Sequence, residues 1–277
     1  MVIILSIFAI FLLLFLIYWL LGANTDLQTV NYTVSSDKIT SPIRVALVTD
    51  LHSCKYGKDQ KELIDAIAAQ NPDLILLAGD IYDDKLPDAP SDIFLKAVGA
   101  RFRSFYIPGN HELRKFKDDN IDAILEKVSS LGITVLFGDY KEISVNGNTI
   151  TICGLTETKE TNEFSGQSFS ELCIAAQNGN YSVLMAHRPS RIDTYLTGDF
   201  DLVVAGHAHG GQWRIPGLLN GLLAPEEGLF PKYAGGKYDF ETATMIVSRG
   251  LARESTIVPR IFNQPELVII DVNPKDT

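Results

Sequence analysis

The fold of this chain is decided by residues 43–52, which read IRVALVTDLH. A run of mostly apolar residues comes first, and the segment then turns polar at Asp50 and His52. A short apolar run of this kind is typical of a buried strand. The stretch therefore predicts a strand that carries chemically active side chains at its C-terminal end.

Four later segments repeat this arrangement, each with metal-binding residues after an apolar run. They are Gly79-Asp80, Gly109-Asn110-His111, Ala186-His187 and Gly206-His207-Ala208-His209. All five histidines of the chain lie in these segments and in the first one. In open α/β sheets, ligands bind beyond the carboxyl ends of the strands, and side chains two residues apart on an extended segment point the same way. We therefore expect these side chains to converge.

Helical and strand patterns alternate in the first half of the chain, and strands dominate the second half. Helical spacing marks residues 58–70, 91–98, 120–131 and 168–177. Further apolar runs mark residues 74–78, 105–107, 133–136, 181–185, 202–204, 242–248 and 267–272. Asn146-Gly147 between two alternating runs predicts a β-hairpin. The pattern predicts one mixed α/β catalytic domain over residues 41–277.

The chain begins with an apolar run at residues 2–21, interrupted only by Ser6. As a helix of about 1.5 Å per residue, it spans roughly 30 Å, the thickness of the bilayer's hydrocarbon core. The alternative, a cleaved signal peptide, requires a basic start, a shorter apolar core and a small-residue cleavage site. We predict a transmembrane anchor over residues 1–22, followed by residues 23–40 as a tether or an edge strand.

Few charged residues near the apolar run indicate on which side of the membrane the catalytic domain lies. Only Lys38 follows the apolar run closely, and this scarcity of basic residues favours an extracytoplasmic domain. Three cysteines without a CxxC pair, Cys54, Cys153 and Cys173, favour the opposite side, because unpaired thiols are typical of reducing compartments. We expect a single-pass cell-membrane protein, with the domain outside the cytoplasm, and a monomer.

Composition limits the classes of partner. The formal net charge is -10, with 46% hydrophobic and 21% charged residues, as in an ordinary folded protein. A protein that binds nucleic acid irrespective of sequence needs a basic surface, so we expect no nucleic-acid partner. An acidic chain still binds phosphate when bound cations supply the positive charge locally.

The order Asp-x-His, Gly-Asp, Gly-Asn-His, His and Gly-His-x-His resembles the calcineurin-like metallophosphoesterase superfamily. The resemblance extends from about Ile43 to Val272. Four later segments, HAHGGQWRIPG, GLFPKYAGG, VSRGL and PRIFNQPEL, are similar to a membrane-anchored bacterial branch that includes UDP-diacylglucosamine pyrophosphatase-like enzymes. The resemblance implies a four-layer α-β-β-α sandwich of two mixed sheets.

The resemblance also assigns seven side chains to a site for two divalent metal ions. In it, Asp50, His52 and His209 bind one ion, Asn110, His187 and His207 bind the other, and Asp80 bridges both. Imidazole, carboxylate and amide ligands together suit Mn, Fe or Zn better than Mg, which prefers oxygen. Two such ions neutralise a phosphate and lower the pKa of a bound water, so we expect a metal-bridging hydroxide to attack phosphorus in line.

Two further residues receive catalytic roles from the resemblance. His111 protonates the leaving oxygen or stabilises the charge that develops on it. Asp83 is the carboxylate expected to orient His111, with Asp84 as the alternative. Among the arginines available to hold substrate phosphate, we single out Arg249, although surface ion pairing explains any of them.

These features predict a phosphodiesterase or pyrophosphatase for a lipid-linked or membrane-proximal phosphate substrate. A broad-specificity phosphomonoesterase or nucleotide phosphodiesterase tethered to the membrane is one alternative, and a metal-stabilised scaffold without turnover is another. The loop over residues 210–237 is unusually apolar. It is either a lid folded onto the domain or a rim that takes acyl chains or touches the bilayer.

Overall fold

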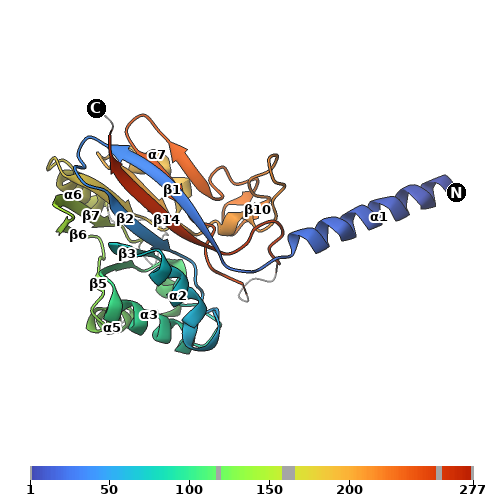
Figure 1. Cartoon of the computed structure of the whole chain (residues 1–277), viewed down its shortest axis with the longest axis horizontal. Coiled ribbons are helices and arrows are strands. Elements are labelled where there is room, and N and C mark those ends of the chain that lie inside the picture. Colours follow the sequence, from blue (N-terminus) through green and yellow to red (C-terminus); the bar gives the residue numbers. More distant parts are fainter. Residues whose placement is uncertain (1, 117–119, 158–165, 254–257, 276–277) are drawn as a thin grey trace.

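The protein, in a computed structural model that describes residues 2–116, 120–157, 166–253 and 258–275, is built around two six-stranded sheets (Figure 1). The first sheet has the order β1 (Gln28–Ser36), β14 (Glu266–Pro274), β2 (Ile43–Val48), β3 (Leu74–Ala78), β4 (Ser104–Ile107) and β5 (Thr134–Val135). The second has the order β12 (Gly236–Asp239), β13 (Thr244–Val247), β9 (Leu202–Ala205), β8 (Tyr181–Met185), β7 (Asn148–Gly154) and β6 (Tyr140–Val145).

Helices cover the outer faces of the sheets. The helical segments are α1 (Val2–Gly22), η1 (Lys58–Gln60), α2 (Lys61–Ala69), α3 (Ala89–Arg101), α4 (Asn110–Lys115), α5 (Asn120–Ser130), α6 (Gly166–Ala176), η2 (Pro189–Arg191), α7 (Ile192–Tyr195) and η3 (His209–Gly211). An apolar core between the sheets takes side chains from both, whereas a second core joins the first sheet to α2, α3 and α5. A third core joins the second sheet to α6 and α7, which completes four layers.

Strand β2 shows why its sequence is almost continuously apolar. Successive side chains of a strand point to opposite faces of the sheet. Val45 and Leu47 therefore enter the core between the sheets, while Ala46 and Val48 enter the core beneath the helices. Because β2, β3 and β4 run parallel, and β7, β8 and β9 do too, their carboxyl ends lie together at one edge of each sheet.

The structure refines three sequence predictions. Residues 28–36 are no free tether, because β1 pairs in parallel with β14 and so forms the edge strand that was the alternative. Helix α2 starts later than the predicted residue 58, since Asp59 and Gln60 adopt left-handed backbone angles (φ 54° and 61°). The loop at residues 210–237 contains a small antiparallel hairpin, β10 (Leu223–Ala224) with β11 (Gly228–Leu229).

Helix α1 projects away from the sandwich (Figure 1). Ile4–Gly22 has a mean hydropathy of 2.9, and none of its most apolar 18-residue window is buried. Among the described residues, this is the one helix long and apolar enough to cross a membrane. A signal sequence near the N-terminus passes the same test of length and hydropathy, so α1 is compatible with a membrane span and with a signal sequence.

Candidate active site

The loops after β2, β3, β4, β8 and β9 bring the predicted site residues to one place, where the two sheets meet. Asp50 receives the backbone N–H of His207 on Oδ1 at 3.0 Å, which joins the first sheet to the second. The glycine at position 206 allows this close approach, because a Cβ there would collide with the Asp50 carboxylate. The convergence expected from the strand ends is therefore present.

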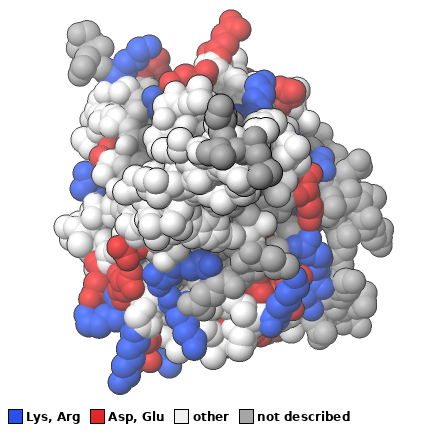
Figure 2. Space-filling model, turned by 90° about the vertical axis from the view of Figure 1, so that its right-hand side faces the viewer, with Lys and Arg blue, Asp and Glu red and all other residues white. Residues whose placement is uncertain are grey.

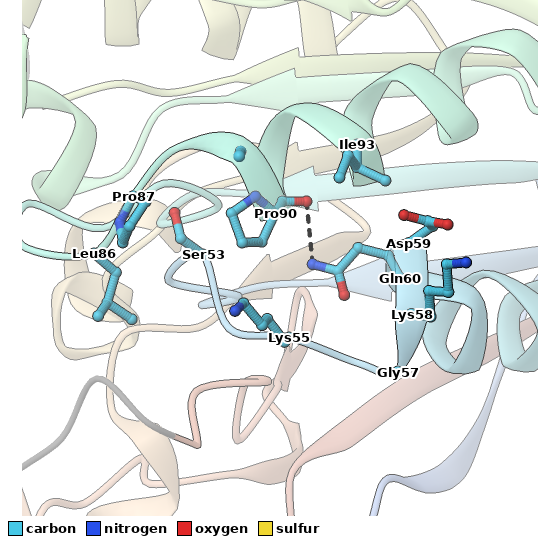
Figure 3. Close-up of a pocket in the computed structure, with 11 residues that line it drawn as sticks. Ser53, Lys55, Gly57, Lys58, Asp59, Gln60, Leu86, Pro87, Pro90 and Ile93 are labelled. Carbon is cyan, nitrogen blue, oxygen red and sulfur yellow. Dashed lines mark hydrogen bonds between the residues drawn. The ribbon is translucent and has the colours of Figure 1, made fainter.

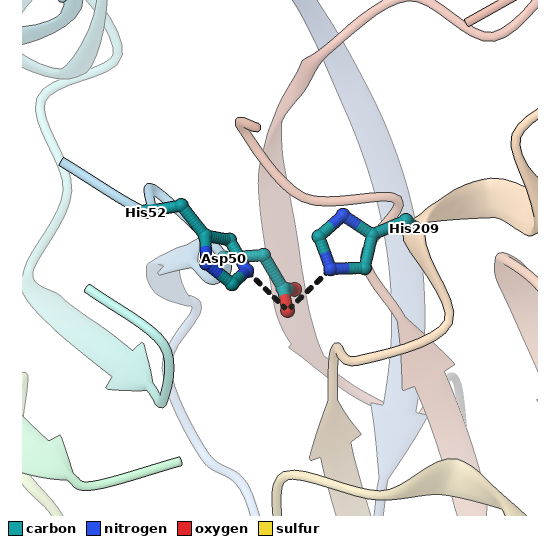
Figure 4. A group of neighbouring side chains, drawn as sticks. All are labelled: Asp50, His52 and His209. Carbon is teal, nitrogen blue, oxygen red and sulfur yellow. Dashed lines mark ion pairs between the residues drawn. The ribbon is translucent and has the colours of Figure 1, made fainter. Parts of the chain in front are cut away.

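One group of side chains contains Asp50, His52 and His209 (Figure 4). Nε2 of His52 lies 3.9 Å from Oδ1 of Asp50, and Nε2 of His209 lies 3.6 Å from the same oxygen. All three side chains are buried. Three groups that could bind a metal ion thus face one another without direct hydrogen bonds between those atoms.

A second group contains Asp80, His187 and His207. Nε2 of His187 lies 3.1 Å from Oδ2 of Asp80. Burial opposes the charged form of each, but their mutual attraction prevails: it raises the pKa of His187 to about 10 and holds the pKa of Asp80 well below its usual range. Asp80 stands between the two groups, because its Oδ2 also lies 3.6 Å from Nε2 of His52.

Asn110 completes the second group. One polar atom of its amide lies 2.9 Å from Nδ1 of His207 and 3.2 Å from Nε2 of His187, and the other faces the guanidinium of Arg114. Without a cation, hydrogen bonding favours the amide nitrogen toward the histidines. With the oxygen toward them, three lone pairs converge, which is what a bound cation requires.

An unpaired buried nitrogen shows that this donor set fits metal ions. Nε2 of His52 is buried and forms no hydrogen bond with any described residue, whereas Oδ2 of Asp80 is paired with Nε2 of His187 at 3.1 Å. Buried polar atoms are normally paired, because leaving one unpaired costs about 1–3 kcal/mol. Imidazole nitrogens and carboxylate oxygens at such separations match the ligand chemistry of Mn, Fe or Zn.

The backbone at the site is strained. Positive φ angles occur at Asp50 (50°), His52 (48°), Asp80 (55°), His207 (64°) and His209 (48°). Non-glycine residues rarely adopt this region, which costs of order 1–3 kcal/mol each, and such residues cluster at functional sites. Five of the seven predicted ligands thus have an unfavourable backbone conformation, which the surrounding packing maintains.

Sequence reasoning missed Glu112, which holds two of these loops together. Its buried carboxylate accepts hydrogen bonds from the backbone N–H groups of Asp80, Ile81, Tyr82 and Gly109, at 2.7–2.9 Å. Burial, and then the Asp80 carboxylate, raise the pKa of Glu112 to about 7. The signal was available, because a glutamate three residues after the N-cap Gly109 is typical of a helix capping box.

The two candidate carboxylates near His111 have different neighbours. Oδ2 of Asp83 lies 3.0 Å from Nδ1 of His52 but 3.8 Å from Nδ1 of His111. Oδ1 of Asp84 lies 3.2 Å from Nδ1 of His111. The geometry therefore assigns Asp83 to His52 and favours the alternative, Asp84, as the carboxylate beside His111.

A small pocket opens over these groups, with a volume of about 160 Å³. It is lined by His52, Asp80, Asp83, Asn110, His111, Arg114, His207, His209, Pro225 and Glu226, a set that we call the metal pocket. His111 is partly exposed at its mouth, and burial lowers the pKa of its imidazole. A reactant at this mouth would meet His111 and the proposed ligands together.

The arginine expected at the pocket is absent from it, and two others lie near the proposed ligands. Arg249 does not line the pocket; its Nε donates to the buried Glu266 at 2.6 Å. Arg114 lines the pocket and donates to Oε1 of Glu226 at 2.8 Å. Nη1 of Arg188 lies 2.9 Å from Nε2 of His207, and its Nη2 lies 2.7 Å from Oε2 of Glu226.

A larger cavity of about 450 Å³ lies next to Ser53 (Figure 3). Its lining includes Lys55, Lys58, Pro90 and Ile93, and none of the predicted ligands. The side chain of Gln60 crosses it to donate to the Pro90 carbonyl at 3.1 Å. This larger cavity is therefore separate from the metal pocket.

The calcineurin-like phosphoesterase family model matches residues 43–211, more than half of the chain. The phosphodiesterase YaeI of Escherichia coli is 27% identical over 240 residues, covering 84% of this chain and 83% of YaeI. An uncharacterized metallophosphoesterase of Campylobacter jejuni is 26% identical over 272 residues, covering 94% of this chain and 67% of that protein.

Among solved structures, the Haemophilus influenzae NAD nucleotidase superposes with a TM-score of 0.53 at 17% identity, over 76% of this chain and 46% of the other. A dimetal phosphatase of Danio rerio gives a TM-score of 0.51 at 13% identity, over 76% and 88%. These two show a shared fold. The fold and the Asp/His groups define a metal-dependent phosphoesterase, and the chain belongs to the calcineurin-like phosphoesterase family.

Proposed function

We propose that this chain is a two-metal phosphodiesterase or pyrophosphatase that acts on a phosphate substrate presented at a membrane. The observation that carries the reaction class is the convergence of two Asp/His groups that meet at Asp80. Asp50, His52 and His209 would hold one ion, Asn110, His187 and His207 the other, and Asp80 both. Bound divalent ions at this place would neutralise the phosphate and activate water for attack on phosphorus.

The protein's own groups then have separate tasks. His111, which lies at the pocket mouth beside Asp84, would supply a proton to the leaving oxygen or stabilise its charge. Asp83 would hold the ring of His52 in its ligating orientation through Nδ1. Glu112 would hold together the loops that carry Asp80 and Asn110, because it accepts hydrogen bonds from the backbone N–H groups of Asp80 and Gly109.

Helix α1 supports the membrane part of the proposal, an anchor at residues 1–22 of a single-pass protein. That the protein is a monomer with its catalytic domain outside the cytoplasm is proposed from the sequence alone. A membrane-proximal substrate is then concentrated where the enzyme is held. A lipid-linked pyrophosphate, the kind of substrate cleaved in the membrane-anchored branch that the sequence resembles, is the class that we propose. The relative YaeI is a phosphodiesterase, which supports a second candidate, the nucleotide phosphodiesterase predicted from the sequence as an alternative.

A substrate panel on the purified full-length protein in detergent tests the proposal. We expect turnover with Mn²⁺ that a chelator abolishes, and a higher kcat/KM for lipid-linked pyrophosphate than for a nucleotide diester or a nitrophenyl monoester. A preference for the soluble diester would support the second candidate. The absence of any metal-dependent turnover on the whole panel would contradict the reaction class.

A further inference from the structure

Exposed apolar side chains gather on the segment that follows the metal ligand His209. Ile215, Leu218, Leu223, Leu229 and Phe230 are between 39% and 81% exposed, and we call these five residues the apolar collar. A folded monomer rarely exposes such side chains together unless they contact a partner. The two ends of the hairpin add to this, because Leu223 pairs directly with Leu229.

The same segment is fixed to α1. The ring of Trp213 contacts Phe15 and Trp19, with centroid separations of 6.3 and 5.9 Å. The hydroxyl of Tyr18 donates to the Arg214 carbonyl at 2.6 Å. At the end of the helix, the Gly22 carbonyl accepts the backbone N–H of Phe262 at 2.8 Å.

The helix therefore leaves the domain in a set direction, from the face that bears the collar. Figure 2 looks onto this face along α1, whose own uncharged residues make up part of the white centre, and shows charged side chains mainly around the margin. A bilayer that takes up α1 would consequently meet this face of the domain first. A soluble protein partner would have to compete with the membrane for the same surface.

The collar also adjoins the metal pocket. Between Leu223 and Leu229, the hairpin turn carries Pro225 and Glu226, which line the pocket. Glu226 is held there by Arg114 and Arg188, at 2.8 and 2.7 Å. This short hairpin thus has exposed apolar strand residues on the side of the domain from which α1 projects, and its turn lies at the metal pocket.

We propose that the apolar collar lies in the head-group region of the bilayer that holds α1, and that this contact sets the metal pocket at the membrane surface. Interfacial binding by partly inserted apolar side chains follows the same physics as an amphipathic helix lying in that region. The inference rests on the proposed anchoring of α1 but not on the identity of the substrate. It explains why an apolar loop begins directly after a metal ligand.

Site-specific fluorescence tests the contact in the full-length protein. Cys54 and Cys153 are buried, so Cys173→Ser removes the partly exposed thiol. Single cysteines at Leu13, Phe230 or Ile174 then carry a nitrobenzoxadiazole label. The protein is reconstituted in vesicles of phosphatidylcholine and phosphatidylglycerol, with and without nitroxide-labelled lipids. Ile174 is the matched control, because it is 71% exposed and lies on α6, away from α1 (Figure 1).

We expect the nitroxide lipids to quench the labels at Leu13→Cys and Phe230→Cys several-fold more than the label at Ile174→Cys. Quenching at Leu13→Cys with none at Phe230→Cys would overturn the collar contact while leaving the anchor intact. No quenching at Leu13→Cys would overturn both. Neither outcome depends on catalysis, so a failure of the proposed reaction is seen separately in the substrate panel.

Discussion

The metal pocket and the apolar collar depart from the ordinary rules of folded proteins in opposite ways. The pocket buries Nε2 of His52, which finds no hydrogen-bond partner among the described residues, beside the buried carboxylate of Asp80. The collar exposes apolar side chains, up to 81% at Leu218, that find no apolar cover. Each departure points to something outside the polypeptide, cations in the first case and a lipid surface in the second.

The two regions also differ in how they should respond to mutation. A change in the pocket removes chemistry, so it should affect soluble and vesicle-bound substrates alike. A change in the collar removes a contact with the bilayer, so it should affect vesicle-bound substrates alone. Variants that violate this division would break the comparison.

The largest effect is expected from Asp80→Asn. Asp80 faces both His52 and His187, so loss of its charge should remove metal from both groups and abolish activity on every substrate. Metal content by mass spectrometry and turnover of a nitrophenyl diester check this. Asp65→Asn, on the exposed surface of α2, is the control and should retain metal and activity. Retention of two metal equivalents by Asp80→Asn would contradict the assignment of the bridge.

A large but selective effect is expected from His111→Ala. Because His111 stands at the pocket mouth rather than within either group, metal content should stay unchanged while kcat falls by about 10²–10⁴. The loss should grow as the leaving group becomes more basic, since a poor leaving group depends most on proton donation. A full rate on an alkyl phosphodiester would remove His111 from catalysis.

Asp83 and Asp84 can each be replaced by the isosteric asparagine, and we expect the two variants to differ. Asp83→Asn should weaken metal affinity by about 10- to 100-fold, because Asp83 supports the ring of His52. Asp84→Asn should leave metal affinity unchanged and lower kcat, because Asp84 lies beside His111. Metal titrations and kcat values separate the two roles. Equal behaviour of the two variants would show that the local geometry does not govern function.

The smallest effect is expected from the double variant Leu229→Ser with Phe230→Ser. Full burial of one such side chain contributes about 1.5–3 kcal/mol, and partial insertion contributes less, so we expect roughly a tenfold loss of kcat/KM on vesicle-bound substrate. The rate on a soluble diester should stay the same. Ile174→Ser controls for the loss of an exposed apolar side chain elsewhere. Equal losses on both substrates would indicate a folding defect instead of a membrane contact.

The sequence by itself determined the strands and the polar residues that follow them. The strand at Ile43–Val48 and the strand at Leu74–Ala78 occupy the predicted residues, and Asp50 and Asp80 follow them at the expected edge. This succeeded because a short, continuously apolar run is a local feature of a buried strand and because neighbouring parallel strands present their carboxyl ends at one edge. The residue types at those ends, together with the family resemblance, then narrowed the predicted chemistry to metal ions and phosphate.

Only the tertiary structure decided which neighbours those residues meet. It placed Asp83 on His52 and Asp84 beside His111, on an irregular loop where no periodicity distinguishes adjacent residues. It paired Arg249 with Glu266 and paired β1 with β14, contacts between residues far apart in the chain. Side-chain partners of this kind depend on how distant segments pack, and a local pattern of residues holds no record of that packing.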